Sequence, residues 1–248
     1  MDILDRYRRQ VVFRGIGAEG QARLARARAT IVGVGALGTA IANSLVRAGF
    51  GFVRLVDSDR VEESNLQRQM LFDEDDAAAG RFKVEAAASR LARINSATAL
   101  EPRVLRVDAS NVEGLVGDVD VVLDGSDNFD VRYAMNDACG RLGVPWIYGG
   151  VLGDSGVTMN VMPRDGPCLR CLMPEAPEPG SFATPETIGV LNQITAVIGS
   201  IEAVEAMKIV LGSPGPRRSL LSISLWDTSF QEITIEPSAS CPICGLRR

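Results

Sequence analysis

The chain has 248 residues, of which 46% are apolar and 23% are charged, with a net charge of −5 and a pI near 5.0. This composition supports a full hydrophobic core, in one large domain or two small ones, and its acidity argues against a general nucleic-acid binder. The uncharged run 187–201 is too short and too polar to cross a bilayer, and the first ten residues lack the apolar segment of a signal peptide. We therefore expect a soluble, cytoplasmic protein that binds neither nucleic acid nor membranes.

The sequence contains no histidine. This excludes every Ser-His-Asp or Cys-His mechanism and every histidine metal ligand. Any catalysis must use acids, cations or cysteine, or else act on a substrate that needs no general base.

The hydrophobic pattern predicts alternating helices and strands up to residue 151. After one or two helices in residues 1–28, strands are expected over 29–32, 52–56, 100–107, 120–123 and 146–151, and helices over 39–48, 79–94, 111–115 and 129–142. The acidic run 73–76 is expected to be a solvated loop. This alternation predicts an α/β fold with a doubly wound, mainly parallel, Rossmann-like sheet.

Beyond residue 151 the pattern changes. It predicts an antiparallel strand over 156–162, a proline-rich mobile loop over 174–187, a long apolar helix over 188–211 and a strand pair at 220–226 and 230–235. No repeat or linker divides the sequence. We therefore expect a single domain over 1–248, in which N-terminal helices (1–28) precede a nucleotide-binding core (29–151) and an antiparallel C-terminal part (152–248).

A glycine turn lies between the first predicted strand and the helix that follows it. Gly33, Gly35 and Gly38 form a Gly-x-Gly-x-x-Gly pattern, and Asp57 ends the next strand. This combination is typical of a nucleotide site, with phosphates at the glycine turn and the acid on a ribose hydroxyl. The alternative is a tight strand-to-helix turn that binds no ligand.

The segment after Asp57 bears on which nucleotide binds. It contains Asn65 and Arg68, and Lys83, one of only two lysines in the chain, follows. If Arg68 and Lys83 point into one pocket, they suit a triphosphate better than a pyrophosphate. The alternative for Arg68 is a solvated surface arginine.

Two acids follow the fourth predicted strand, Asp124 at its end and Asp127 in the turn. Ligands of open parallel sheets bind at the carboxyl ends of the strands, where either acid could hold a Mg²⁺ on the nucleotide phosphates. The alternative for Asp127 is the N-cap of the next helix.

Four of the five cysteines form two Cys-x-x-Cys pairs, Cys168 with Cys171 and Cys241 with Cys244. In a cytoplasmic protein this pattern indicates a metal rather than disulfides, and four thiolates make a closed, structural zinc site. A redox dithiol is the alternative. Cys139 is expected to be a small core residue.

Taken together, these motifs resemble the MoeB/ThiF/HesA family, relatives of the ubiquitin-activating enzymes. The resemblance spans nearly the whole chain and is carried by Arg6-Tyr7-x-Arg9-Gln10, Gly33-x-Gly-x-x-Gly38, Asp57-Ser-Asp59, Ser64-Asn-Leu-Gln-Arg-Gln69, Lys83, Ser126-Asp-Asn128 and the two cysteine pairs. It implies that the chain uses Mg-ATP to adenylylate the C-terminal Gly-Gly carboxylate of a small ubiquitin-like sulfur-carrier protein.

The resemblance also implies roles for individual residues. The residues expected to bind the nucleotide are Gly33, Gly35, Gly38, Asp57, Asp59, Asn65, Arg68, Lys83, Asp127 and Asn128. The residues expected to take part in catalysis are Arg9, Arg68, Lys83 and Asp127. Asp57 would bind ribose, and Asp127 the Mg²⁺. The phosphates would be held by Asn65, Arg68 and Lys83. Arg9 would reach the phosphates of a neighbouring subunit, which implies a homodimer.

The chain departs from the family in one consequential way. Many members carry a cysteine in the loop before the long helix, where this chain has none and has Thr184 and Pro185 near the expected place. We therefore expect adenylylation without a covalent relay. The chain also shows no rhodanese domain, so a separate protein is expected to donate the sulfur. A nicotinamide-dependent oxidoreductase and a non-catalytic scaffold for a ubiquitin-like protein remain the alternative functions.

Overall fold

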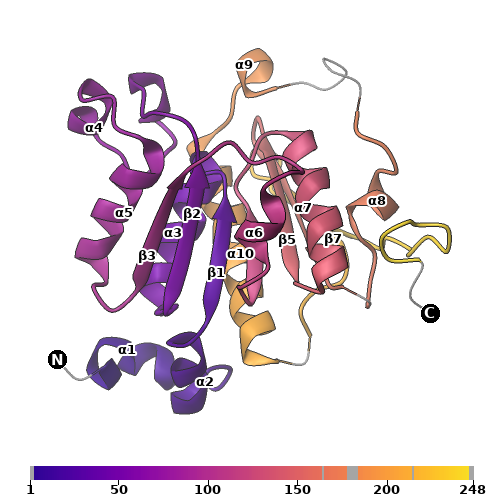
Figure 1. The fold of residues 1–248 in the computed structure, drawn as a ribbon, viewed down its shortest axis with the longest axis horizontal. Helices are drawn as coiled ribbons and strands as arrows, with labels where there is room; N and C mark the ends of the chain where they lie inside the picture. The colour runs from indigo at the N-terminus through magenta and orange to yellow at the C-terminus, as the bar shows by residue number, and fades with distance from the viewer. Residues whose placement is uncertain (1–2, 164, 178–183, 214, 246–248) are drawn as a thin grey trace.

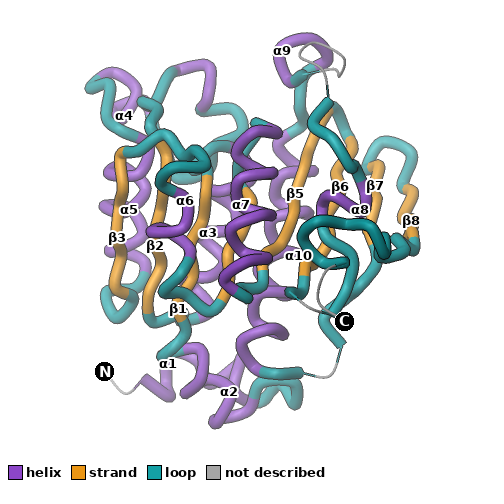
Figure 2. Tube along the Cα trace, turned by 45° about the vertical axis from the view of Figure 1, so that its right-hand side comes forward, coloured by secondary structure: helices purple, strands orange, loops and turns teal. Residues whose placement is uncertain are grey.

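The computed structural model describes residues 3–163, 165–177, 184–213 and 215–245. Within these ranges the chain forms an eight-stranded sheet with the order β3-β2-β1-β4-β5-β6-β7-β8 (Figures 1 and 2). The strands are β1 (Arg28–Val32), β2 (Phe52–Asp57), β3 (Ala99–Val104), β4 (Val121–Asp124), β5 (Trp146–Leu152), β6 (Ser155–Val161), β7 (Leu220–Ser224) and β8 (Ser229–Ile233). Strands β1 to β5 pair in parallel, and β6 to β8 extend the sheet antiparallel. The predicted fold class is confirmed.

Helices cover both faces of the sheet (Figure 1). One face packs against α3 (Ala36–Ala48), α5 (Lys83–Ile94) and α10 (Asn192–Leu211), and the other against α6 (Val112–Val116) and α7 (Phe129–Leu142). The helices α1 (Ile3–Val11) and α2 (Gly17–Leu24) lie below the sheet, and the short helices are η1 (Glu63–Asn65), α4 (Glu74–Ala78), α8 (Leu169–Leu172) and α9 (Pro185–Ile188). None of the described helices combines the length and apolarity needed to span a bilayer.

The central strands are apolar along their whole length because both of their faces are covered. Ile31 packs in the core beneath α3 and α10, whereas its neighbour Val32 packs in the core beneath α6 and α7. The helices begin and end on local signals as well. Asn128 caps α7 by accepting hydrogen bonds from the next turn, and Gly143 ends that helix in the left-handed region at φ 76°.

The acidic run 73–76 is not the solvated loop that its composition predicts. Asp73 caps α4 by accepting a hydrogen bond from the backbone N of Asp76 (3.1 Å). The Asp76 side chain is buried and pairs with Arg81 (2.8 Å). The run therefore forms a helix because its first acid is a good N-cap and its last acid has a cationic partner.

Several predicted boundaries shift where glycine intervenes. The helix predicted over 79–94 begins at Lys83, after Gly80 at φ +55°, and the helix predicted from 188 begins at Asn192, after Gly189 at φ +80°. The strand predicted over 100–107 ends at Val104. Part of the predicted mobile loop, 178–183, lies outside the described residues.

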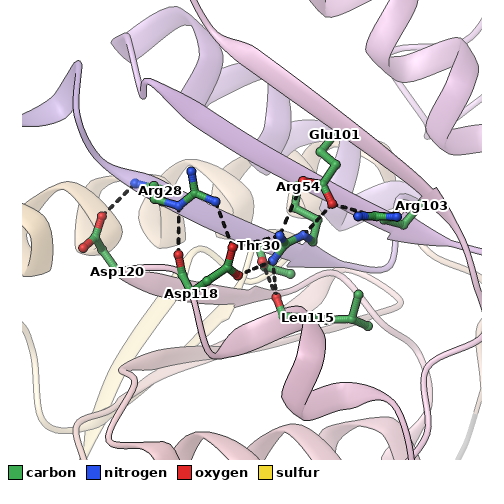
Figure 3. A network of polar contacts seen from close by, with 8 residues as sticks. All are labelled: Arg28, Thr30, Arg54, Glu101, Arg103, Leu115, Asp118 and Asp120. Carbon is green, nitrogen blue, oxygen red and sulfur yellow. Dashed lines mark hydrogen bonds and ion pairs between the residues drawn. The ribbon is translucent and has the colours of Figure 1, made fainter.

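The short helix α6 is fastened to the sheet by a polar network around Arg54 (Figure 3). Arg54 stands at the centre of β2 and is 5% exposed. Its guanidinium donates to Glu101 on β3 (3.0 Å), to Asp118 (2.6 Å) and to the carbonyl of Leu115 near the end of α6 (2.7 Å). The hydroxyl of Thr30 on β1 donates to the same carbonyl (2.8 Å). The network therefore satisfies a helix-end carbonyl that would otherwise be buried without a donor.

Replacing Arg54 with methionine should lower the free energy of unfolding by about 2 kcal/mol at pH 7, because Glu101, Asp118 and the Leu115 carbonyl lose their common donor. The expected loss is smaller than for a fully buried pair because the Asp118 side chain is 51% exposed. Arg54 also lowers the pKa of Glu101 and holds the pKa of Asp118 at about 2. Both acids therefore stabilise the fold only while ionised, and the loss should shrink as the pH falls from about 5 to about 2.

Denaturant titrations over this pH range measure both effects. Arg103→Met is the matched control, because Arg103 is largely exposed and pairs with Glu101 alone among the acids of this network. It should cost less than about 1 kcal/mol. A loss in Arg54→Met that does not change with pH would contradict the assignment.

Candidate functional site

The glycine turn is shaped by backbone packing against the end of β4. A Cβ at Gly33 would lie 2.4 Å from the carbonyl oxygen of Gly125, and one at Gly38 would lie 2.0 Å from that of Gly33. Neither position tolerates a side chain. Gly35 differs, because the nearest atom to a Cβ there is Nε2 of Gln69 at 3.8 Å. The space beside Gly35 is therefore free of backbone contacts.

The first turn of α3 follows directly and is suited to an anion. Its N-cap, Gly35, offers no side-chain hydrogen bond. The unpaired N–H groups of a helix start, together with the positive end of the helix dipole, bind phosphate. The turn from Gly33 to α3 can therefore hold a nucleotide phosphate.

Asp57 joins the end of β2 to the glycine turn. Its carboxylate accepts hydrogen bonds from the backbone N of Val34 (2.7 Å) and of Asp59 (2.8 Å). Burial raises the pKa of Asp57, although those two hydrogen bonds and the charge of Lys83 oppose the rise. A carboxylate has about four acceptor positions, so room remains for a hydroxyl group of a ligand.

Lys83 is brought to the same place. It is the first residue of α5 and is 7% exposed, and its Nζ donates to Asp59 (2.9 Å). The structure therefore brings Asp57, Asp59 and Lys83 together beside the glycine turn. The ammonium group has three donors, so it can bind a phosphate oxygen as well as Asp59.

The segment that contains Asn65 and Arg68 folds into a turn around η1. Asn65 is buried, and its side chain accepts a hydrogen bond from the backbone N of Glu62 (3.2 Å). Arg68 is half-buried and donates to the carbonyl of Ser64 (2.8 Å). The segment ends at Gln69, which is 4% exposed and near Gly35, and whose Oε1 has no partner among the described residues.

The two acids after β4 have different environments. Asp124 is fully buried, pairs with Arg132 (2.9 Å) and accepts hydrogen bonds from the backbone N and the hydroxyl of Ser126. Asp127 is exposed. The interpretation of Asp127 as the N-cap of α7 is wrong, because the cap is Asn128, which uses its Oδ1 for that purpose. Of the two acids, Asp127 is therefore the one accessible to solvent.

Arg9 lies away from these residues. It is exposed on α1. Two other side chains of α1 donate hydrogen bonds to the last turns of neighbouring helices: Gln10 to the carbonyl of Ala48 in α3, and Arg6 to the carbonyl of Ile94 in α5. Helix α1 therefore lies at the edge of the sheet opposite the glycine turn (Figure 1). The structure does not bring Arg9 to the site of its own chain.

Two side chains at the site are missing from the sequence-based prediction, Gln69 and Arg132. Gln69 could have been found, because it ends the motif that contains Asn65 and Arg68. Arg132 carries no local signal, since an arginine in the second turn of a helix is usually solvated. It is buried here because Asp124 accepts its Nε–H.

The four paired cysteines converge. Their Sγ atoms all lie within 4.8 Å of one another, with 3.5 Å between Cys168 and Cys241 and 3.2 Å between Cys171 and Cys244. Burial, followed by the adjacent Cys241 thiol, raises the pKa of Cys168 to about 12. Four clustered sulfur ligands fit a closed tetrahedral zinc site, in which the metal would favour the thiolates. The structure thus brings the C-terminal turn against the start of α8.

Comparisons with known proteins agree with this geometry. A model of the ThiF family matches residues 7–243. The chain is 42% identical to the SAMP-activating enzyme E1 of Haloferax volcanii, covering 98% of this chain and 89% of that protein. It is 40% identical to the sulfur carrier protein ThiS adenylyltransferase of Bacillus subtilis, over 98% of this chain and 72% of that protein. It is 39% identical to the sulfur carrier protein adenylyltransferase of Thermus thermophilus, over 98% of this chain and 91% of that protein.

Solved structures support the fold independently. The crystal structure of Escherichia coli MccB with MccA-N7isoASN superposes with a TM-score of 0.86 at 24% identity, covering 97% of this chain and 75% of that one. The family model and the curated relatives extend over nearly the whole chain. The chain therefore belongs to the ThiF family and is an adenylyltransferase.

Proposed function

We propose that the chain uses Mg-ATP to adenylylate the C-terminal Gly-Gly carboxylate of a small ubiquitin-like sulfur-carrier protein, with release of pyrophosphate. The observation that carries this proposal is the gathering of Asp57, Asp59 and Lys83 beside the uncapped start of α3. Two of the relatives that match 98% of this chain are named as adenylyltransferases of sulfur carriers.

The chemistry suits a protein without histidine. A carboxylate is already ionised near neutral pH, so its attack on the α-phosphorus needs no general base. The new bond joins the carboxylate oxygen to that phosphorus, and the bond to the pyrophosphate leaving group breaks. Catalysis then depends on positioning and on stabilising negative charge.

Each residue of the site has a role in this reaction. Asp57 binds the ribose hydroxyls, while Asn65, Arg68 and Lys83 hold the phosphates. Asp127 binds a Mg²⁺ ion, which when present neutralises phosphate charge. Asp59 orients Lys83 through their ion pair (2.9 Å). Asn128 fixes the start of α7 beside Asp127.

The acyl-adenylate is the last intermediate that this chain forms. Residues 174–189 contain no cysteine. The four paired cysteines are gathered in one cluster, and burial raises the pKa of the Cys139 thiol to about 12. No exposed reactive thiol is therefore available for a thioester or acyl-disulfide step. A separate donor protein supplies the sulfur.

Arg9 acts on a second copy of the chain. It lies at the edge of the sheet opposite its own glycine turn, so a phosphate contact requires a neighbouring subunit. The exposed apolar side chains that follow it, Val12 (79% exposed) and Phe13 (62%), supply a surface that a homodimer would cover.

Carrier-dependent exchange of labelled pyrophosphate into ATP tests the proposed reaction, using purified ubiquitin-like sulfur carriers that end in Gly-Gly. Arg68→Ala should lower the exchange rate at least about 100-fold, because a cation on the transferred phosphates is lost. Arg93→Ala is the matched control, since Arg93 is exposed in the last turn of α5, and it should leave the rate unchanged. An absence of exchange with every carrier, although ATP binds, would overturn the proposal.

Asparagine substitutions separate the two acids after β4. Asp127→Asn should raise the Mg²⁺ concentration needed for exchange and leave the midpoint of unfolding unchanged, because the side chain is exposed. Asp124→Asn should instead lower the free energy of unfolding by about 3 kcal/mol, because Arg132 would keep a buried charge without its partner. Magnesium titrations of the exchange rate and denaturant titrations measure the two effects, and equal effects of both variants would contradict the assignment.

Cys241→Ser should reduce the zinc content of the purified protein and lower its stability, because a metal site that forms on folding contributes its binding free energy to the fold. Metal analysis and thermal denaturation with and without a chelator measure this. Cys139→Ser is the control, since Cys139 lies outside the cluster and its replacement should leave the zinc content unchanged. Full zinc occupancy in Cys241→Ser would count against the four-cysteine site.

A further inference from the structure

The carboxyl group of Glu202 is buried and has no hydrogen-bond partner in the part of the chain that the structure describes. The residue is on α10, its exposure is 0%, and neither oxygen contacts a donor among the described residues. A Cβ on Gly149 of β5 would lie 2.1 Å from Oε1 of Glu202. The carboxyl group therefore lies directly against the backbone of β5.

Glu205, one turn later on the same helix, shows what an ionised buried acid needs. It is 4% exposed, and its carboxylate accepts hydrogen bonds from Lys208 (2.7 Å), the backbone N of Arg217 (3.0 Å) and Asn160. Burial alone would raise the pKa of Glu205, but these three donors outweigh it and the pKa is lowered. Glu202 has none of these contacts.

The charges that face Glu202 come from several elements. They are Asp124 of β4, Arg132 of α7 and Arg217 from the segment before β7, and the neutral phenol of Tyr148 of β5 also lies near. Burial and then the negative charge of Asp124 raise the pKa of Glu202 well above its usual range, while the two arginines oppose that rise. A buried carboxylate without a donor is costly, so geometry and charge both favour the neutral acid.

Gly149 connects Glu202 to the candidate functional site. Its carbonyl accepts a hydrogen bond from Nη2 of Arg132 (3.0 Å), which also donates to the carbonyl of Ser126 (2.8 Å). Nε of the same guanidinium donates to Asp124 (2.9 Å). Arg132 thus holds both sides of the turn that precedes Asp127, and it does so next to the backbone against which Glu202 packs.

We propose that Glu202 is a positioning residue that works as a neutral carboxylic acid. While it is uncharged, Arg132 stays bound to Asp124 and Ser126 and keeps the turn before Asp127 in place. When it loses its proton, the new carboxylate competes with Asp124 for Arg132 and loosens that turn. The consequence for catalysis rests on the proposed function, whereas the protonation and the turn can be measured without it.

The pH dependence of unfolding tests the protonation. A pKa raised in the folded state means that the folded protein binds an extra proton, so the contribution of Glu202 to wild-type stability should fall as the pH rises above about 4.5. Glu202→Gln keeps the size of the neutral acid and removes the titration. Relative to this variant, the wild-type unfolding constant should rise up to tenfold per pH unit until Glu202 ionises.

Glu205→Gln is the matched control and should behave in the opposite way. Because the pKa of Glu205 is lowered, its contribution is present above about pH 4.5 and is lost as the pH falls below it. This variant should therefore raise the unfolding constant at neutral pH, by about tenfold or more, and by less in acid. If Glu202→Gln follows the same pattern as Glu205→Gln, Glu202 is an ionised, paired acid and the proposal is overturned.

Hydrogen–deuterium exchange tests the link to the turn in the nucleotide-free protein. The backbone N–H of Ser126 donates to Asp124 (2.9 Å). After correction for intrinsic exchange rates, peptides covering 123–131 should lose protection in wild type as the pH rises and Glu202 ionises, but keep it in Glu202→Gln. Equal loss in both proteins would overturn the positioning role.

The rate of pyrophosphate exchange provides the functional readout. Glu202→Gln should match wild type at pH values where Glu202 is protonated, and it should retain its rate at higher pH, where Glu202 ionises and wild type declines. The same decline with rising pH in both proteins would refute the catalytic consequence. An absence of exchange in either protein at any pH would refute the proposed function instead, while the unfolding and deuterium measurements would still decide the role of Glu202.

Discussion

The candidate site depends on a contact between two backbones that no side chain could enter. The turn after β1 and the turn after β4 meet at Gly33, Gly38 and Gly125, where an added Cβ would lie between 2.0 and 2.4 Å from a carbonyl oxygen. The sheet order reverses between these two strands, and ligands of doubly wound sheets bind at that point. The glycines therefore join the half of the site that holds Asp57 and Lys83 to the half that holds Asp127.

The elements that sequence predicts well are those with a strong local signal. The glycine turn, Asp57 at the end of β2 and Lys83 at the start of α5 all follow from residue type and spacing, and the structure gathers the first turn of α3, Asp57 and Lys83 in one place. The environment of Asp124 does not follow in this way. Its burial depends on Arg132, and only the folded helix α7 brings that guanidinium beneath the turn.

Local capping explains most of the remaining differences between prediction and structure. The acidic run at 73–76 has the composition of a loop, yet Asp73 caps a helix there and Asp76 is buried against Arg81. Periodicity places a helix near 79–94 but cannot show that Gly80 delays its start. Hydrophobic periodicity also does not predict the side chains that hold α6 against the sheet. Arg54 interrupts an apolar strand, and it is buried only because it pairs with acids from two other segments.

The acids near the site are arranged so that little uncompensated negative charge faces an anionic nucleotide. The carboxylate of Asp57 accepts hydrogen bonds from two backbone N–H groups. Asp124 pairs with Arg132, and Asp59 pairs with Lys83. Glu202 has no hydrogen-bond partner among the described residues, and in our proposal its proton removes the charge that Arg132 compensates in Asp124. Asp127 is exposed, which in the proposed reaction leaves it accessible to a Mg²⁺ ion bound to the phosphates. On the same proposal, a triphosphate meets little repulsion at this edge of the sheet, because the interior carboxyl groups are paired with donors or, for Glu202, protonated.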